Sequence, residues 1–359
     1  MARALMKGTE AIAEAAIQAG CKYFFGYPIT PQNEIPEYMS ANLPKVGGFY
    51  VQGESEVASI NMVMGGACTG KRVMTTSSSP GISLMSEGIS YISMCELPCV
   101  IVNIARGGPG LGNILPSQGD YSQATRGVGH GDHSIIVLAP GNLQEAVDLT
   151  QDAFELSQKY RMPVMVLADG FMGQMMEAVD IKPRAHEDPS VNAPWALGWW
   201  NERGGHHLTV YSMHMDPDKL EAHDRHLQEK YAKVRANEQR FERFHVDDAE
   251  LVLTSYGTTS RVCRSAIANL RAEGLKVGMV RPITMWPFPV SGFEMPKSVK
   301  GILDVEMSAA FQMEDDVRLA TLCDLPIATT GRWGGHSPTV RQVEEKCREL
   351  LGVSSAPAK

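Results

Sequence analysis

Side chains that could do chemistry follow four predicted strands, each at the point where its strand ends. They are hydroxyls, carboxylates and a guanidinium: residues 27–30, Glu54 and Glu56, residues 77–79, and Arg106. Because the carboxyl ends of parallel strands meet at one edge of a sheet, and ligands bind outside that edge, these side chains should lie together. They would suit a small anion together with a carboxylate that handles a proton.

Each of these residues also has a plainer interpretation. Thr30 is followed by Pro31, so Thr30 could cap a helix that begins at that proline. Glu54 and Glu56 would be favourable near the positive N-terminus of a helix, and Arg106 could be a surface charge. Their common position after successive strands is what favours a site.

Residues 77–81, SSSPG, run from a predicted strand into a predicted helix and place Ser79 where a serine hydrolase exposes its nucleophile. The residue after such a nucleophile must donate a backbone N–H to the oxyanion, and Pro80 has none. A serine hydrolase is therefore the alternative from another enzyme class. Ser79 is better explained as an N-cap followed by proline at the first helical position.

A glycine-rich segment, RGGPGLG, follows the fourth predicted strand and contains Gly107, Gly108 and Gly110. It lacks the G-x-G-x-x-G spacing and does not run directly into a helix, so a nicotinamide site is not expected. Glycine allows a backbone to approach a ligand closely. We interpret the segment as a mobile loop over a site, with a structureless surface loop as the alternative.

The elements that would position these residues alternate between short apolar strands and helices. Strands are expected at 22–25, 49–52, 72–77, 98–105, 134–140 and 163–169, and helices at about 9–19, 31–39, 54–67, 81–94 and 143–160. Continuous apolar strands separated by helices indicate a parallel sheet that is covered on both faces. We therefore predict a doubly wound α/β domain over residues 1–178.

The rest of the chain divides into two further parts. Residues 179–247 break the alternation and are expected to form a connector with one long charged helix, DKLEAHDRHLQEKYAKVRANEQRFERF. Between residues 248 and 355 strands and helices alternate again, which predicts a second, smaller α/β domain. A chain of 359 residues is long enough for two such domains.

Composition argues against several classes of protein. The net charge is -8 with no basic block, so a nucleic-acid partner is not expected. No apolar run approaches the ~20 residues of a membrane span, and Lys7 and Glu10 fall where a signal peptide would be apolar. Seven scattered cysteines favour a reducing cytoplasm. Their spacing suits neither zinc nor an iron–sulfur cluster, so no metal site is expected on this chain.

Several ordered motifs resemble the α subunit of the 2-oxoacid:ferredoxin oxidoreductases. They are YPITP, GESEVAS, TSSSPGISLMSEGISY, ELPCVIVNIARGGPGLG with PSQGD, and LRAEGLKVGMVRPITMWPFP with ILDVEM. The resemblance covers essentially the whole chain and is closest to the branched-chain (2-oxoisovalerate) and 2-oxoglutarate types. It implies that residues 1–178 are the pyrimidine-binding domain of a thiamine diphosphate enzyme and that residues 248–355 resemble the transketolase C-terminal domain.

The resemblance also implies roles for individual residues. Glu56 would contact the aminopyrimidine ring of thiamine diphosphate, with Glu54 as the alternative. Thr30 and Arg106 match positions that contact the substrate or its carboxylate. The remaining implied contacts are cofactor contacts from Pro28, Ile29 and Ser79, and a substrate loop that contains Gly107, Gly108 and Gly110.

Two features of the family have no match in this sequence. The GDG…N motif that holds the diphosphate through Mg²⁺ is missing, since Ala168-Asp169-Gly170 lacks the first glycine, and no cysteine spacing suits a cluster. The resemblance therefore implies that a β subunit holds the diphosphate and Mg²⁺, and that 4Fe-4S clusters lie in partner subunits. Further implied partners are γ and ferredoxin-like δ subunits and ferredoxin, with coenzyme A as the acyl acceptor.

The substrate class is predicted from the number of basic residues in the motifs. A second carboxylate, as in 2-oxoglutarate, would call for a second basic residue, and none of the motifs clearly provides one. This favours 2-oxoisovalerate or another branched-chain acid, with 2-oxoglutarate as the alternative.

Overall fold

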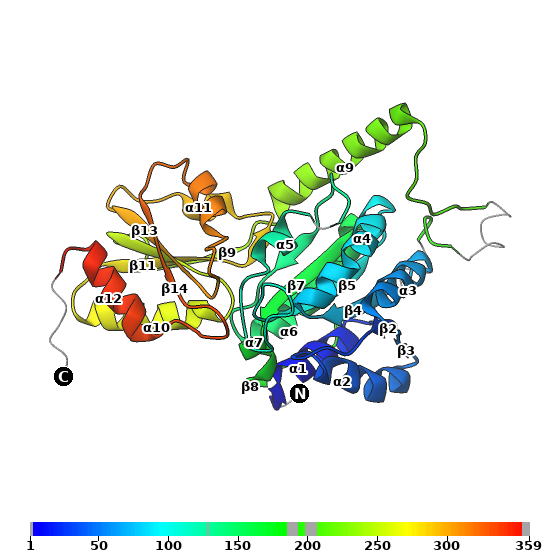
Figure 1. Ribbon diagram of the computed structural model, residues 1–359, viewed down its shortest axis with the longest axis horizontal. Helices are drawn as coiled ribbons and strands as arrows, with labels where there is room; N and C mark the ends of the chain where they lie inside the picture. Colours follow the sequence, from blue (N-terminus) through cyan, green and yellow to red (C-terminus); the bar gives the residue numbers. More distant parts are fainter. Residues whose placement is uncertain (1–2, 128, 185–192, 198–206, 354–359) are drawn as a thin grey trace.

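The computed structural model describes residues 3–127, 129–184, 193–197 and 207–353. It contains two main sheets, one in each half of the chain, and helices pack against both (Figure 1). The two halves lie beside each other along the long axis of the molecule. The α/β class predicted from the sequence is confirmed.

The larger sheet is parallel except for one edge strand. In spatial order its strands are β12 (Thr284–Trp286), β6 (Ile136–Leu138), β7 (Pro163–Asp169), β5 (Cys99–Ala105), β4 (Val73–Ser77), β2 (Tyr23–Gly26) and β3 (Phe49–Gln52). Every residue of β4, β5 and β7 is buried, so helices cover both faces of the sheet, as the continuous apolar runs predicted.

The helices of this half form two groups. One group is α1 (Gly8–Gln18), α2 (Glu34–Asn42) and α6 (Leu143–Tyr160), in which α1 packs on the other two. The other is α3 (Glu56–Cys68) against α4 (Ser79–Met94). Helices α3 and α4 each begin just after a strand ends, so their N-termini lie at the carboxyl edge of the sheet.

The smaller sheet forms the core of the second half. Its strands, in spatial order, are β14 (Ile327–Gly331), β13 (Gly301–Glu306), β10 (Leu251–Thr254), β11 (Val277–Pro282) and β9 (Phe241–Phe244). Helices α10 (Thr259–Ala272) and α12 (Val340–Leu350) pack on each other beside it. Helix α11 (Glu314–Ala320) contacts the first half, because Asp316 accepts a hydrogen bond from the Tyr121 hydroxyl at 2.5 Å.

Helix α2 begins at Glu34 rather than at Pro31. Residues 29–32 form a turn in which the Gln32 N–H donates to the Ile29 carbonyl at 3.0 Å, and the Thr30–Pro31 peptide bond is cis. Pro31 therefore belongs to the turn before the helix, and its predicted position as the first helical residue was wrong.

Two antiparallel edge strands were not predicted. Helix α9 (Pro217–Asn237) ends before the FERF sequence that was expected to continue it, and FERF forms β9 against β11. Strand β12 belongs to the second half by sequence but pairs with β6 of the larger sheet. Both pairings join segments far apart in the chain, so local periodicity could not indicate them.

A further two-stranded sheet pairs β1 (Ala4–Lys7) with β8 (Met176–Val179) near the start of α1.

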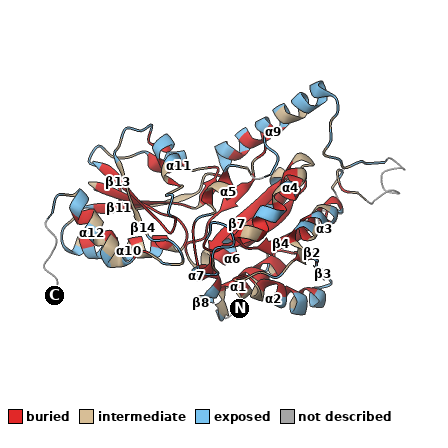
Figure 2. Ribbon diagram, viewed as in Figure 1, coloured by how far each residue is buried: buried red, intermediate tan, exposed pale blue. Residues whose placement is uncertain are grey.

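Helix α9 exposes most of its surface, as Figure 2 shows. Among the residues that the structure describes, no helix combines the length and apolarity needed to cross a membrane.

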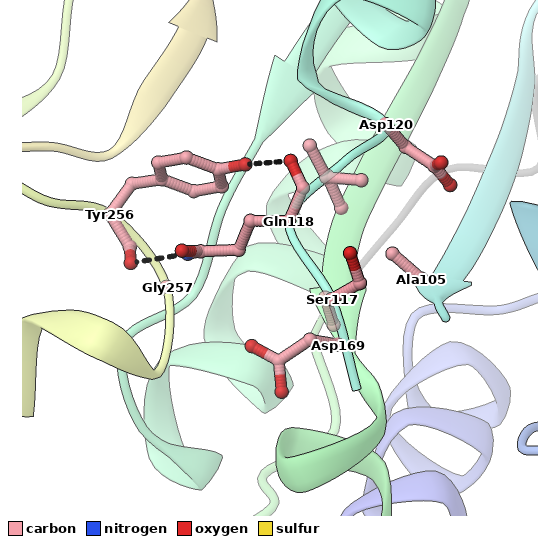
Figure 3. Close-up of a pocket in the computed structure, with 9 residues that line it drawn as sticks. Ala105, Ser117, Gln118, Asp120, Asp169, Tyr256 and Gly257 are labelled. Carbon is pink, nitrogen blue, oxygen red and sulfur yellow. Dashed lines mark hydrogen bonds between the residues drawn. The ribbon is translucent and has the colours of Figure 1, made fainter. Parts of the chain in front are cut away.

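Gln118 joins the two halves through its buried side-chain amide. Its Nε2 donates to the Tyr256 carbonyl at 2.8 Å, and its Oε1 accepts from the Thr259 hydroxyl and the Met307 N–H, each at 2.8 Å. The Tyr256 hydroxyl donates in return to the Gln118 carbonyl at 3.0 Å (Figure 3). The segment that carries Gln118 is therefore held by β10, α10 and β13 together.

Arg281 forms a second buried link between the halves. Its two terminal nitrogens donate to the Glu145 carboxylate of α6 at 2.9 and 2.6 Å, and its Nε donates to Glu242 of β9 at 3.1 Å. Fork-shaped pairing of this kind fixes orientation as well as distance.

Replacing Gln118 by alanine should destabilise the junction. The substitution leaves the Thr259 hydroxyl and the Met307 N–H buried without their acceptor, and each such group costs about 1–3 kcal/mol. We expect Gln118→Ala to lower the urea midpoint of unfolding clearly, and Gln228→Ala, at an exposed position of α9, to leave it unchanged. Equal midpoints for the two variants would contradict this role.

Candidate functional site

Glu56 is the first residue of α3, directly after strand β3 and a short turn. Ser55 caps the helix, since its hydroxyl accepts from the Ala58 N–H at 3.1 Å. The cap aims the Glu56 side chain inward, and the residue is only 6% exposed. Within the described ranges the carboxylate accepts no hydrogen bond and forms no ion pair. Glu54, the alternative, is exposed.

The Glu56 carboxylate lies against the start of α4 at Gly81. A Cβ at residue 81 would lie 2.7 Å from Glu56 Oε1 and 2.0 Å from Ser77 Oγ, so only glycine leaves room for both groups. The Ser77 hydroxyl is buried and has no hydrogen-bond partner. A free carboxylate and a free hydroxyl are thus adjacent, which suits a ligand with nitrogen donors and acceptors.

Arg106 follows β5 and is buried, with 6% of the residue exposed. Its Nη1 donates to the Thr30 carbonyl at 2.8 Å and its Nη2 to the Leu111 carbonyl at 3.4 Å, while Nε is buried without a partner. No carboxylate pairs with it in the part of the chain that the structure describes. The guanidinium is therefore an uncompensated buried positive charge.

Thr30 reaches this site through its backbone. Its carbonyl accepts from Arg106, and its hydroxyl is only 3.5 Å from Asn33 Nδ2. Asn33, not Thr30, occupies the N-cap position of α2, so the helix-cap interpretation of Thr30 was wrong. Pro28 is exposed and Ile29 is half-buried on the same turn.

Ser79 is the first residue of α4, and Ser78 takes the N-cap position predicted for Ser79. The Ser79 hydroxyl donates to Asp120 Oδ2 at 2.7 Å and accepts from the Arg106 N–H at 2.9 Å. Asn103 donates to the same Asp120 oxygen at 2.8 Å. This network ties the backbone of Arg106 to the first turn of α4. No histidine bonds to Ser79 among the described residues, as a hydrolase would need.

The glycine segment continues from Arg106 as a folded loop. Its ends meet where the Gly107 N–H donates to the Leu115 carbonyl at 2.9 Å. Gly108 and Gly110 border an open pocket with about 1070 Å³ of empty space, together with Ser79, Asp120 and, from the second half of the chain, Ala310 and Trp333. The loop thus lies beside the predicted site.

A small cavity of about 10 Å³ lies at the junction of the two halves, between the ends of β5 and β7 and residues 256–257 (Figure 3). Asp120 and Asp169 line it, and burial raises the pKa of both carboxyl groups. Asp169 caps a short helix, α7 (Gly170–Gln174), by accepting from the Phe171 and Met172 N–H groups at 2.9 and 3.1 Å.

Sequence reasoning did not identify Asp120, Gln118, Tyr256 or Gly81 as parts of this region. The quoted PSQGD motif contains the first two, but no local pattern shows that they face α4 and the second half of the chain. No group of three or more histidine, cysteine, aspartate or glutamate residues suited to a metal ion was found in the described ranges.

Comparison with known proteins agrees with this geometry. Residues 14–243 match the family model described as pyruvate flavodoxin/ferredoxin oxidoreductase, thiamine diphosphate-binding, and residues 249–343 match the pyruvate:ferredoxin oxidoreductase core domain II. The chain belongs to the 2-oxoacid:ferredoxin oxidoreductase family. It is therefore an oxidoreductase subunit, and the resemblance noted in the sequence is confirmed.

Two relatives within the family illustrate its range. The chain is 48% identical to the ketoisovalerate oxidoreductase subunit VorB of Methanothermobacter thermautotrophicus, over 99% of this chain and 100% of that one. It is 41% identical to the 2-oxoglutarate synthase subunit KorA of Methanocaldococcus jannaschii, over 79% of this chain and 83% of that one. Both are subunits of larger enzymes by name.

Two solved structures share the fold. The 2-oxoglutarate:ferredoxin oxidoreductase from Magnetococcus marinus, with 2-oxoglutarate, coenzyme A and succinyl-CoA bound, matches with a TM-score of 0.84 and 29% identity. The match covers 97% of this chain, which spans 65% of that longer chain. A split-gene transketolase matches with a TM-score of 0.59 and 12% identity, a likeness of fold alone.

The Gly81 position offers a direct test of this geometry. We expect Gly81→Ala to displace the Glu56 carboxylate and to weaken binding of thiamine diphosphate by the assembled enzyme by about tenfold or more, because small misplacements at a reacting centre are costly. Calorimetric titration measures the affinity. Gly65→Ala is the control, since Gly65 has open space around it; equal affinities for both variants would show that the close contact at Gly81 does not matter.

Proposed function

We propose that this chain is the α subunit of a thiamine diphosphate-dependent 2-oxoacid:ferredoxin oxidoreductase that acts on 2-oxoisovalerate. The reaction is oxidative decarboxylation of the 2-oxoacid to an acyl-CoA, with coenzyme A as acceptor and the electrons passed to ferredoxin. 2-Oxoglutarate is the alternative substrate.

One observation carries the proposal: two buried groups of opposite charge, Glu56 and Arg106, flank the first turn of α4 and neither has a counter-ion among the described residues. Removing an ion from water without a partner is costly. Folded proteins keep such groups where a ligand pairs with them. Glu56 suits a ring that can be protonated, and Arg106 suits a carboxylate.

The residues beside Glu56 fit the aminopyrimidine ring of thiamine diphosphate. When bound, this cofactor supplies the carbanion that attacks the 2-oxo group and stabilises the charge left by decarboxylation. Glu56 would bond to the ring nitrogen and hold the proton there, and the free Ser77 hydroxyl lies next to it. Pro28, Ile29 and Ser79 stay proposed cofactor contacts.

Arg106 would hold the carboxylate of the 2-oxoacid, with Thr30 beside it. Two guanidinium nitrogens already donate to carbonyls, so the group is oriented before substrate arrives, and its Nε is buried without a partner. Charge-assisted hydrogen bonds of this type are strong and directional. Gly107, Gly108 and Gly110 would form the substrate loop.

The pocket beside the loop favours an apolar side chain on the substrate. Its lining includes Pro109, Ala309, Ala310 and Trp333, and it contains no lysine, arginine or histidine. A second carboxylate would find no counter-charge there, which supports 2-oxoisovalerate over 2-oxoglutarate. The higher identity to ketoisovalerate oxidoreductase subunits agrees with this choice.

The active site is shared with a partner subunit. Asp169 lies in the segment most similar to a diphosphate motif, but its Oδ1 already accepts two N–H groups of its own helix. Burial also raises the pKa of this carboxyl group, which disfavours the ionised form that Mg²⁺ needs. A β subunit would hold the diphosphate and Mg²⁺, with 4Fe-4S clusters in partner subunits, and γ and δ subunits would complete the enzyme. A reducing cytoplasmic location is supported by the seven free thiols.

A serine hydrolase is not supported, because the Ser79 hydroxyl is engaged by Asp120 and by the backbone of Arg106. It also stands directly before Pro80, which has no N–H to donate to an oxyanion. The surroundings of Ser79 instead support a role in positioning Arg106.

Replacing Glu56 by glutamine keeps the side chain's size and removes its charge. We expect Glu56→Gln in the complete complex to lower 2-oxoacid oxidation by about 100-fold or more, the typical worth of a positioned acid–base group, while gel filtration shows unchanged assembly. Glu54→Gln should keep near-normal rates because Glu54 is exposed. The reverse pattern would transfer the role to Glu54, and normal rates for both variants would overturn the proposal.

The substrate can be identified with a panel of 2-oxoacids on the native complex, using coenzyme A and a low-potential dye as electron acceptor. We expect kcat/KM for 2-oxoisovalerate to exceed that for 2-oxoglutarate by at least about tenfold, since the pocket lining offers a second carboxylate no cationic partner. A preference for 2-oxoglutarate would contradict the substrate assignment but not the reaction. No turnover of any 2-oxoacid would contradict the reaction itself.

A further inference from the structure

We infer that Asn113 is a positioning residue through which the C-terminal half of the chain holds the substrate-binding Arg106 in place. The inference rests on the proposed role of Arg106 and extends it. It assigns to the second half of the chain a direct part in substrate binding, at the contact between Asn113 and the backbone of Gly334.

The backbone N–H of Asn113 and both polar atoms of its side chain hold the loop that follows Arg106. Its backbone N–H donates to the Gly107 carbonyl at 2.8 Å, and its Oδ1 accepts from the Leu115 N–H at 2.9 Å. Its Nδ2 donates across to the Gly334 carbonyl at 3.1 Å. The first two bonds close the loop on itself, and the third attaches the closed loop to the segment after β14.

The loop can close this tightly only because glycines occupy the positions where its two sides come into contact. Gly112 has φ +57, and a Cβ there would lie 1.7 Å from the Gly107 carbonyl oxygen. A Cβ on Gly107 would lie 2.7 Å from Asn113 Oδ1. Residues with side chains would push Asn113 away from Gly107, so the glycines serve the contacts of Asn113 as well as access to the pocket.

Arg106 depends on the position of this loop at three points. Its Nη2 donates to the Leu111 carbonyl at 3.4 Å, its backbone forms an isolated bridge with Pro116, and the adjacent Gly107 bonds to Leu115. A shift of the loop would therefore remove one of the two hydrogen bonds that orient the guanidinium. Thr30 alone would then fix its direction.

The C-terminal half contacts the loop at both its middle and its end. Near Asn113, a Cβ on Gly335 would lie 2.5 Å from the Leu115 Cβ, so the two backbones are in close contact. At the far end of the loop, Gln118 bonds to Tyr256 (Figure 3) and also to Thr259 and Met307. The end held by Gln118 is buried and rigid, whereas the middle depends on Asn113.

The experiment compares Asn113→Ala and Asn113→Ser with the native complex. A serine can still accept from the N–H two residues ahead and so keep the local turn, but it is too short to reach Gly334. Both variants should therefore raise KM for the 2-oxoacid about 3- to 10-fold, the effect of one hydrogen bond, with kcat and the affinity for thiamine diphosphate within about twofold of the native values.

Two further measurements separate the possible outcomes. Hydrogen exchange of residues 107–116 should become faster in both Asn113 variants, and Asn61→Ala, whose amide bonds only within α3, is the control for both readouts. If Asn113→Ser had the native KM while Asn113→Ala had a raised KM, the local turn alone would account for the effect. That result would overturn the role of the contact with Gly334.

Arg106→Ala shows which idea has failed if the results disagree. Suppose that KM rises strongly in Arg106→Ala, while both Asn113 variants show faster hydrogen exchange but the native KM. The proposed function would then stand, and the inference about Asn113 would be overturned. Unchanged KM in Arg106→Ala would overturn the substrate role of Arg106 and the inference with it. Unchanged exchange in the Asn113 variants would show that Asn113 does not hold the loop.

Discussion

The Glu56 carboxylate and the Arg106 guanidinium are two buried groups that pair with no counter-ion among the residues the structure describes, and they set the constraint on which the rest of this structure depends. An ion removed from water must be held by other charges or dipoles, or the chain relaxes until water reaches it. Both groups rest on the first turn of α4, where Gly81 admits the carboxylate and the Ser79 hydroxyl accepts from the Arg106 backbone. The fully buried strands β4 and β5 hold that turn rigidly.

The second half of the chain contacts segments next to this site, although its own sheet is separate from the larger sheet. Gln118 and Arg281 are buried polar groups whose hydrogen bonds cross the junction, so separating the halves would leave several donors and acceptors unpaired. The loop that carries the glycines runs between Arg106 and Gln118 and is therefore fixed at both ends. In our proposal, the second half of the chain helps to aim Arg106 through the contact between Asn113 and Gly334.

The sequence predicted where the candidate site residues lie, because these residues follow strand ends. Glu56, Arg106, Thr30 and Ser79 all lie at the expected edge of the sheet. Their individual contacts were predicted less well: Thr30 uses its carbonyl where a hydroxyl cap was expected, and Ser79 bonds to Asp120 in place of capping its helix. Side-chain partners far apart in sequence leave no local pattern, which is why these contacts were missed.

The sequence by itself determined the class of fold, the order of most strands and helices, and the set of residues at the carboxyl edge. These features follow from hydrophobic periodicity and from the glycines and prolines that end helices and strands. Both signals act over a few residues. Only the tertiary structure decided that Glu56 is buried while Glu54 is exposed, and that Arg106 pairs with no carboxylate in the described part of the chain. Burial and pairing depend on which distant segments pack together, as when β12 returns to the larger sheet and Asn113 reaches Gly334.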